Sequence, residues 1–83
     1  MALRANRAYH LTVKRGGMHP ALFSSERRDR IEIVSIDDGE VVLFWELPAR
    51  RASRLLKALR ADLAGLSADA FISRWEGTDD RSG

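Results

Sequence analysis

The sequence contains no cysteine and only two prolines and two lysines. Without cysteine there can be no disulfide, no thiolate metal site and no cysteine nucleophile. No apolar run approaches the roughly 18 residues that a membrane-spanning helix needs, and the N-terminus lacks the apolar segment of a signal peptide. We therefore expect a protein without membrane contact, located in the cytoplasm.

The length of 83 residues leaves room for one small domain. A domain of this size gains only about 3–5 kcal/mol from its core. It has no space for a Rossmann unit with a substrate domain, for a barrel or for a kinase. The apolar fraction of 45% is ordinary for a globular chain, so we do not expect disorder throughout.

The charges are segregated along the chain, and twelve of the fourteen bases are arginine. The net charge is +5 over residues 1–30, −5 over 31–47, +4 over 48–64 and −2 over 65–83. Arginine binds phosphate and carboxylate groups as a fork, which favours an anionic partner. The many arginines and alanines also fit the codon usage of a GC-rich bacterial genome, but codon usage does not explain the blocks of one sign.

Alternating apolar and polar residues predict three strands, over Tyr9–Arg15, Arg28–Ile36 and Glu40–Glu46. Residues 16–27 form a loop between the first two strands, with Leu22 and Phe23 as an apolar tether. The second and third strands are separated by a short turn, which predicts an antiparallel hairpin.

Gly39 supplies the positive φ that this hairpin turn needs. A three-residue loop with Gly39 in a bulge pairs Ile36 with Glu40 and Ile31 with Trp45, whereas a two-residue turn shifts the pairing by one residue. We favour the three-residue loop, because it collects one apolar set on a single face. That set is Ile31, Ile33, Val41, Leu43 and Trp45.

Two helices follow the hairpin. Pro48 suits the first turn of a helix that runs to about Ala64, with Leu47 as a poor N-cap and Gly65 as the C-terminal stop. Ser67 caps a second, short helix that ends at Gly77. The apolar stripe of the long helix consists of Ala49, Ala52, Leu55, Leu56, Leu59 and Leu63. The stripe of the short helix consists of Ala68, Phe71, Ile72 and Trp75.

The element order predicts an α+β fold, a three-stranded antiparallel meander followed by one long and one short helix (β-β-β-α-α). We expect a single domain over residues 9–77. Residues 1–8 form a flexible N-terminal tail in this prediction, and residues 78–83 a disordered C-terminal tail.

Both faces of the predicted hairpin are apolar, and the long helix can cover only one. The second face then indicates a homodimer, either sheet on sheet or through an edge strand. The alternative is that the short helix or the N-terminal segment folds over it. The predicted dimer interface consists of Val34, Ile36, Val42 and Phe44.

No motif in the sequence indicates catalysis or a bound metal. His10 and His19 lack the partners of a nucleophilic triad and the spacing of metal ligands. The acidic segment 37–40 resembles a calcium loop only superficially, and a turn accounts for its composition. Glu32 and Glu40 could form an acid–base pair, but they are better interpreted as solvated residues at the rim of the sheet. We expect no catalytic residue, no metal, no cofactor and no enzymatic activity.

The strongest functional feature is a basic stripe about 15 Å long on the long helix. Such a stripe suits an acidic protein surface or the phosphates of a nucleic acid, although a solvated helix face is the plain interpretation. We predict an accessory module that presents this stripe to a partner protein. The alternative is a nucleic-acid-binding regulatory protein. The stripe consists of Arg50, Arg54, Lys57 and Arg60.

Overall fold

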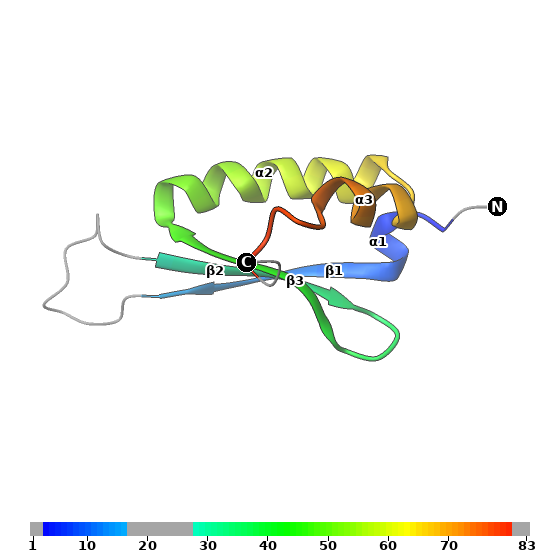
Figure 1. The fold of residues 1–83 in the computed structure, drawn as a ribbon, viewed down its shortest axis with the longest axis horizontal. Coiled ribbons are helices and arrows are strands. Elements are labelled where there is room, and N and C mark those ends of the chain that lie inside the picture. The colour runs from blue at the N-terminus through cyan, green and yellow to red at the C-terminus, as the bar shows by residue number, and fades with distance from the viewer. Residues whose placement is uncertain (1–2, 17–27, 81–83) are drawn as a thin grey trace, which may run out of the picture.

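A computed structural model describes residues 3–16 and 28–80 of the chain (Figure 1). The elements are α1 (Ala5–Ala8), β1 (Tyr9–Arg15), β2 (Arg28–Ser35), β3 (Val41–Pro48), α2 (Ala49–Gly65) and α3 (Ala68–Trp75). This confirms the predicted α+β order of three strands, a long helix and a short helix, with one unpredicted helical turn in front. The predicted tether at Leu22 and Phe23 lies outside the described residues.

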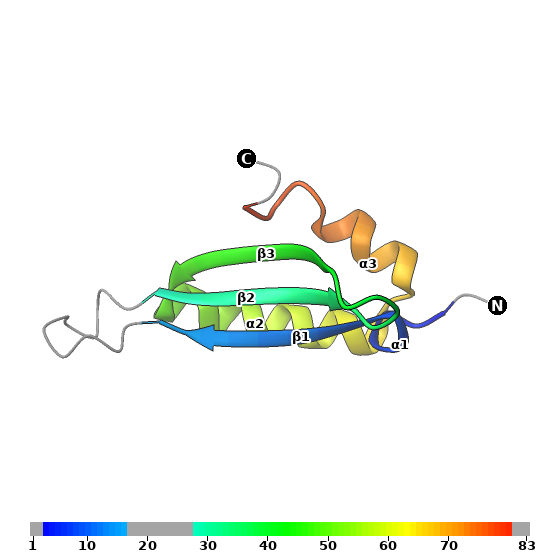
Figure 2. The same cartoon turned by 90° about the horizontal axis from the view of Figure 1, so that it is seen from below.

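The three strands form one antiparallel sheet in the order β1-β2-β3, and α2 packs across one face of it (Figures 1 and 2). Alternate residues of a strand point to the same face, and residues three or four apart share one side of a helix. Each large side chain buried between the two layers contributes about 1.5–3 kcal/mol. The buried residues of these layers are Ile31, Ile33, Leu43 and Trp45 from the sheet, and Ala52, Leu56, Leu59 and Leu63 from α2.

The face of the sheet turned away from α2 is here called the open face, because no described helix lies against it (Figure 2). It carries the strand residues that alternate with the core residues. They are His10, Thr12, Lys14, Arg30, Glu32, Val34, Phe44 and Glu46.

The β2–β3 hairpin keeps the predicted register at its base and departs from it near the turn. Ile31 lies opposite Trp45, as predicted. The register shifts between Ile33 and Val34, so that Val34 lies opposite Val41. A β-bulge therefore adds one residue to β3 and changes the faces of the residues beyond it.

The predicted pairing of Ile36 with Glu40 is wrong. The Ser35 N–H donates to the Glu40 carbonyl at 2.8 Å, and the Ile36 N–H donates to the Ala8 carbonyl at 2.9 Å. Gly39 has a φ of +75°, and its N–H donates to the Ser35 carbonyl at 2.8 Å. The positive-φ glycine was therefore identified correctly, but the loop is one residue longer than predicted.

Helix α2 has no side-chain cap at its N-terminus, whereas a side chain from another segment bonds to its C-terminal turn. Its N-cap is Pro48, one residue after the predicted Leu47, and no side chain bonds to the free N–H groups of its first turn. At the other end, Arg4 Nη1 donates to the Ala64 carbonyl at 3.0 Å. This contact places a positive charge at the negative end of the helix dipole.

The short helix α3 begins and ends as predicted. The Ser67 hydroxyl accepts from the Ala70 N–H at 3.2 Å, and Gly77 follows the helix with a φ of +85°. Within residues 3–16 and 28–80, no helix combines the length and the apolar character that a bilayer-spanning helix needs.

The N-terminal segment differs from the predicted flexible tail over residues 1–8. Ala5 is fully buried, and its N–H donates to the Leu66 carbonyl at 3.0 Å. The Ala68 N–H donates to the Leu3 carbonyl at 2.7 Å. The segment before β1 therefore pairs with the α2–α3 connection and fills the end of the core.

The C-terminal segment 78–80 differs in the same way from the predicted disordered tail over 78–83. The Asp79 carboxylate, 5% exposed, accepts from the Phe44 N–H at 3.1 Å. The Asp80 N–H donates to the Phe44 carbonyl at 2.8 Å, and its carboxylate accepts from the Glu46 N–H at 2.8 Å. This segment thus covers the outer edge of β3.

Candidate functional site

The four residues of the predicted basic stripe all lie on the outer face of α2, and all are exposed. The apolar residues of the helix face the sheet, so the bases at intervals of three and four residues share the opposite side. The basic face of α2, as this surface is called below, consists of Arg50, Arg54, Lys57 and Arg60.

No member of the basic face has an ion pair or a side-chain hydrogen bond within residues 3–16 and 28–80. The single acid of α2, Asp62, is engaged elsewhere: its Oδ2 accepts from Trp75 Nε1 at 3.0 Å and pairs with Arg74 Nε at 3.0 Å. Glu32 and Glu46 of the acidic hairpin lie beyond the sheet on the open face. The basic face therefore keeps its full charge.

The open face of the sheet holds its charges in pairs. Arg30 lies between two acids, with Nε 2.7 Å from Glu32 and Nη1 3.0 Å from Glu46. Glu32 also pairs with Lys14 at 3.7 Å and accepts from the Thr12 hydroxyl at 3.2 Å. The hydrogen bond from Arg30 lowers the pKa of the Glu32 carboxyl, and Lys14 and Thr12 lower it further, against an opposing effect of burial.

The structure does not gather the four predicted dimer residues into one apolar patch. Val34 is 9% exposed within the chain itself, whereas Ile36 is 51% exposed at the turn. Val42 packs against the core under α2. The guanidinium of Arg30 lies 4.1 Å from the centre of the Phe44 ring, so a charged group covers that side chain.

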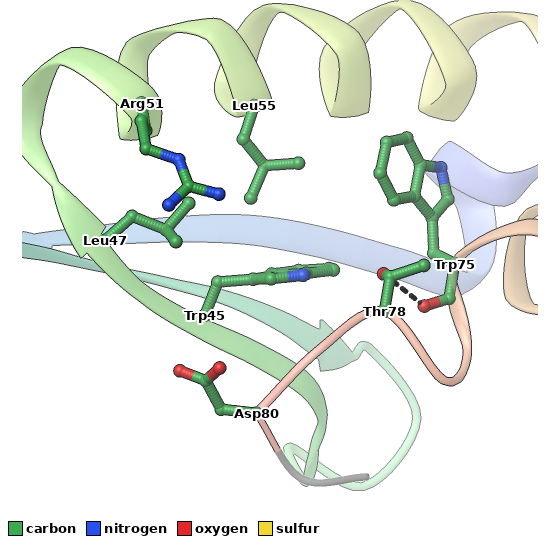
Figure 3. A pocket seen from close by; sticks show the side chains of 7 residues that line it. All are labelled: Trp45, Leu47, Arg51, Leu55, Trp75, Thr78 and Asp80. Atoms are coloured by element: carbon green, nitrogen blue, oxygen red, sulfur yellow. Dashed lines mark hydrogen bonds between the residues drawn. The ribbon is translucent and has the colours of Figure 1, made fainter. Parts of the chain in front are cut away.

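A pocket of 380 Å³ opens between α2, β3 and the C-terminal segment 78–80 (Figure 3). Its volume lies near the lower end of the range of about 300–1,000 Å³ typical of ligand pockets. The rings of Trp45 and Trp75 meet edge to face, 6.1 Å apart. The pocket is lined by Trp45, Leu47, Arg51, Leu55, Trp75, Thr78 and Asp80.

The pocket combines apolar walls with one cationic side chain, Arg51, that has no ion pair within the described residues. Arg51 extends from α2 over Leu47 (Figure 3), and it has no ion pair within the described part of the chain. Asp80 faces it from the far side, where its carboxylate already accepts from the β3 backbone. This arrangement suits a ligand in which an apolar group lies next to an acidic group, because the apolar group can contact the walls and the acidic group can pair with Arg51.

The residues considered for catalysis or metal binding do not come together in the described structure. His10 is exposed on the open face, and His19 lies outside the described residues. Residues 3–16 and 28–80 contain no cluster of three potential metal ligands. The lowered pKa of Glu32 is the opposite of what a general acid needs. Glu40 belongs to a turn in which its N–H donates to Asp38 Oδ1 at 3.0 Å.

Sequence reasoning missed Arg51 and the segment 78–80 as parts of a site. Arg51 follows Arg50 by about 100° around the helix, which places it at the border between the basic and the apolar sides. Asp79 and Asp80 gave no signal, because two acids after a helix-terminating glycine are also typical of a solvated tail.

Comparison with known proteins finds no matching protein-family model, curated protein or solved structure.

Proposed function

We propose that the protein is a non-enzymatic interaction module that binds an acidic surface of a partner protein through the basic face of α2. One observation carries this proposal: within residues 3–16 and 28–80 the bases of this face have no ion pair, whereas Arg30 and Lys14 on the open face are paired. A group of unpaired positive charges attracts and orients an anionic partner.

The positions of the bases along α2 support a role in binding rather than in stability. Arg50 and Arg51 lie in the first turn, where the helix dipole is positive, and the first turn contains no acid. Each base there costs about 0.3–1 kcal/mol. Arg50, Arg54 and Lys57 are also spaced four and three apart, so that they repel each other. An acidic partner removes both penalties when it binds.

The pocket beside the basic face favours a protein partner over a nucleic acid. Its walls, with Arg51 above them, suit an apolar side chain next to acidic residues. Binding to single strands relies on exposed aromatic rings that stack with bases. Trp45 is only 4% exposed, and its ring and that of Trp75 meet edge to face. Nucleic-acid binding through the same arginines is the alternative function.

Fluorescence anisotropy with two labelled probes tests this function. One probe is a twelve-residue peptide of aspartate and glutamate with a single phenylalanine, and the other is a thirty-nucleotide oligo-dT. We expect the peptide to bind at about 50 mM salt and to lose affinity as salt screens the charges. The oligo-dT should bind more weakly than the peptide.

A double charge reversal shows whether the basic face is the site. The variant Arg54→Glu with Lys57→Glu should weaken peptide binding at least about tenfold, which corresponds to 1.4 kcal/mol. The control, Arg7→Glu, reverses an exposed base that lies outside the basic face and has no ion pair within the described residues, and it should bind like the parent. Equal loss in both variants would show that the position of the bases does not matter. Tighter binding of oligo-dT would replace this function by the alternative, and no binding of either probe would contradict both.

A further inference from the structure

The two edges of the sheet differ in what covers them. Along β3, the segment 78–80 bonds to the outward N–H and C=O groups of Phe44 and to the outward N–H group of Glu46. Along β1, helix α1 lies at the start of the strand, where the Tyr9 N–H donates to the Ala5 carbonyl, and no described element lies beside the rest of its outer side (Figure 2). An uncovered strand edge is a template for pairing with another strand.

The hydrogen bonds between β1 and β2 show which backbone N–H and C=O groups of β1 point away from β2. The Ile36 N–H donates to the Ala8 carbonyl at 2.9 Å, and the Gly16 N–H donates to the Arg28 carbonyl at 3.0 Å. Bonded pairs alternate along an antiparallel ladder. The even-numbered residues of β1 therefore bond to β2, and the odd-numbered residues point their backbone groups away from it.

The outward backbone groups are those of Tyr9, Leu11, Val13 and Arg15. The Tyr9 N–H already donates to the Ala5 carbonyl. The N–H groups of Leu11, Val13 and Arg15 have no acceptor within the described residues. The side chains of Leu11 and Val13 lie against the core and remain half-buried, so that a further strand beside β1 would also bury apolar surface.

We propose that a second copy of the chain pairs antiparallel along β1, across a two-fold axis that passes beside Thr12, and forms one continuous six-stranded sheet. In this register Leu11 and Val13 exchange hydrogen bonds with Val13 and Leu11 of the other copy. The Arg15 N–H donates to the Tyr9 carbonyl of the other copy. Each outward N–H group of β1 that lacks an acceptor within the described residues thereby gains one.

Three features favour a second copy of this chain in this register. A two-fold axis at Thr12, the middle of the seven-residue strand, gives each residue of β1 a partner. The antiparallel direction places the two basic strand ends, at Lys14 and Arg15, at opposite ends of the interface, where they do not repel each other. The two Thr12 side chains meet across the axis, a favourable cross-strand pair.

Single cysteines test the register directly, because the chain contains no other cysteine. The two Thr12 Cα atoms would lie about 4.5 Å apart in a non-hydrogen-bonded pair, close enough for a disulfide. The two His10 Cα atoms would lie about 14 Å apart, four residues out of step along the strand. Thr12→Cys should therefore form a covalent dimer under mild oxidation, and His10→Cys alone should not.

The exposure of the two positions makes this comparison decisive. His10 is exposed and Thr12 is half-buried, so random collisions would link His10→Cys more readily. A mixture of His10→Cys and Lys14→Cys should form a mixed disulfide, because these residues face each other in the proposed register. Equal or faster linking of His10→Cys alone, or no linking of Thr12→Cys at micromolar concentration, would overturn the proposal.

Light scattering after size-exclusion chromatography tests the assembly without cysteines. The parent chain should have about twice the monomer mass of 9.3 kDa. Val13→Pro removes an N–H group that points away from β2, a position at which an edge strand accepts proline. This variant should be a monomer with the parent's far-ultraviolet circular dichroism. A monomeric parent chain, or a folded Val13→Pro that remains a dimer, would contradict the pairing.

Discussion

On the open face of the sheet Lys14 and Arg30 each have an acid within 4 Å, whereas no base on the basic face of α2 has one within the described residues. Both surfaces carry arginine and lysine, and they lie on opposite sides of the two layers that the sheet and α2 form. Arg30 is fixed between Glu32 and Glu46, and its guanidinium lies over Phe44. Arg54 on α2 has no such neighbour within the described residues.

This difference shows that the number of arginines says little about their role. A paired arginine contributes to the fold, and its charge is cancelled locally. An unpaired arginine keeps its charge for an external partner and contributes little to stability. Substitutions on the two faces should therefore differ in their effects on folding and on binding.

The largest effect is expected for Glu32→Ala on the open face. Glu32 is 7% exposed and accepts from Arg30 and Thr12. Its removal should lower the free energy of unfolding by about 1–2 kcal/mol, because charge-assisted hydrogen bonds are lost. Urea denaturation measures this change. Glu40→Ala, at the exposed turn, is the control and should be neutral. If both variants are equally stable, the paired charges do not support the fold.

The acid dependence of stability should follow from the lowered pKa of Glu32. A carboxyl with a lowered pKa in the folded state stabilises the protein above its unfolded pKa of about 4.3. That contribution is lost as the pH falls through the lower folded value. Between about pH 5 and pH 3, unfolding free energy should therefore fall more steeply for the parent than for Glu32→Gln. Parallel curves would show that Glu32 does not titrate as an ion-paired group.

The sequence predicted those parts of this comparison that depend on periodicity. The 3.6-residue period of the long helix correctly placed Arg54 and Lys57 on the side opposite Leu56 and Leu59. The two-residue period of the strands likewise placed Ile31 opposite Trp45. Both patterns are local, and a buried apolar set fixes them strongly.

The parts that failed depend on contacts between residues distant in the sequence. The bulge that adds Val42 to β3 changed the expected side of that residue, and the sequence indicated a bulge only at Gly39. In the sequence Asp79 is typical of a solvated tail. Its role as acceptor of the Phe44 N–H, thirty-five positions away, depends on the fold. On the second sheet face, the sequence pattern did not show that Arg30 would lie over Phe44.

The next effect in size has the opposite sign and concerns the first turn of α2. Arg50→Glu replaces a base by an acid at the positive end of the helix dipole and should raise the free energy of unfolding by about 0.3–1 kcal/mol. Arg60→Glu, in the second half of the helix, is the matched control and should give no gain. Thermal denaturation of both variants measures the difference. An Arg50→Glu variant less stable than the parent would mean that Arg50 supports the fold.

The smallest effect is expected for Arg54→Ala. Arg54 is exposed and unpaired within the described residues, and alanine is the best helix former. The change also relieves repulsion from Arg50 and Lys57, so that unfolding free energy should stay within about 0.5 kcal/mol of the parent. Arg30→Ala, the same substitution on the open face, should be clearly less stable, because it leaves Glu32 without its shortest ion pair. Urea denaturation of this pair compares the two faces with identical chemistry. Equal losses of unfolding free energy would mean that arginines on both faces support the fold. The stability data would then no longer favour a binding role for the basic face.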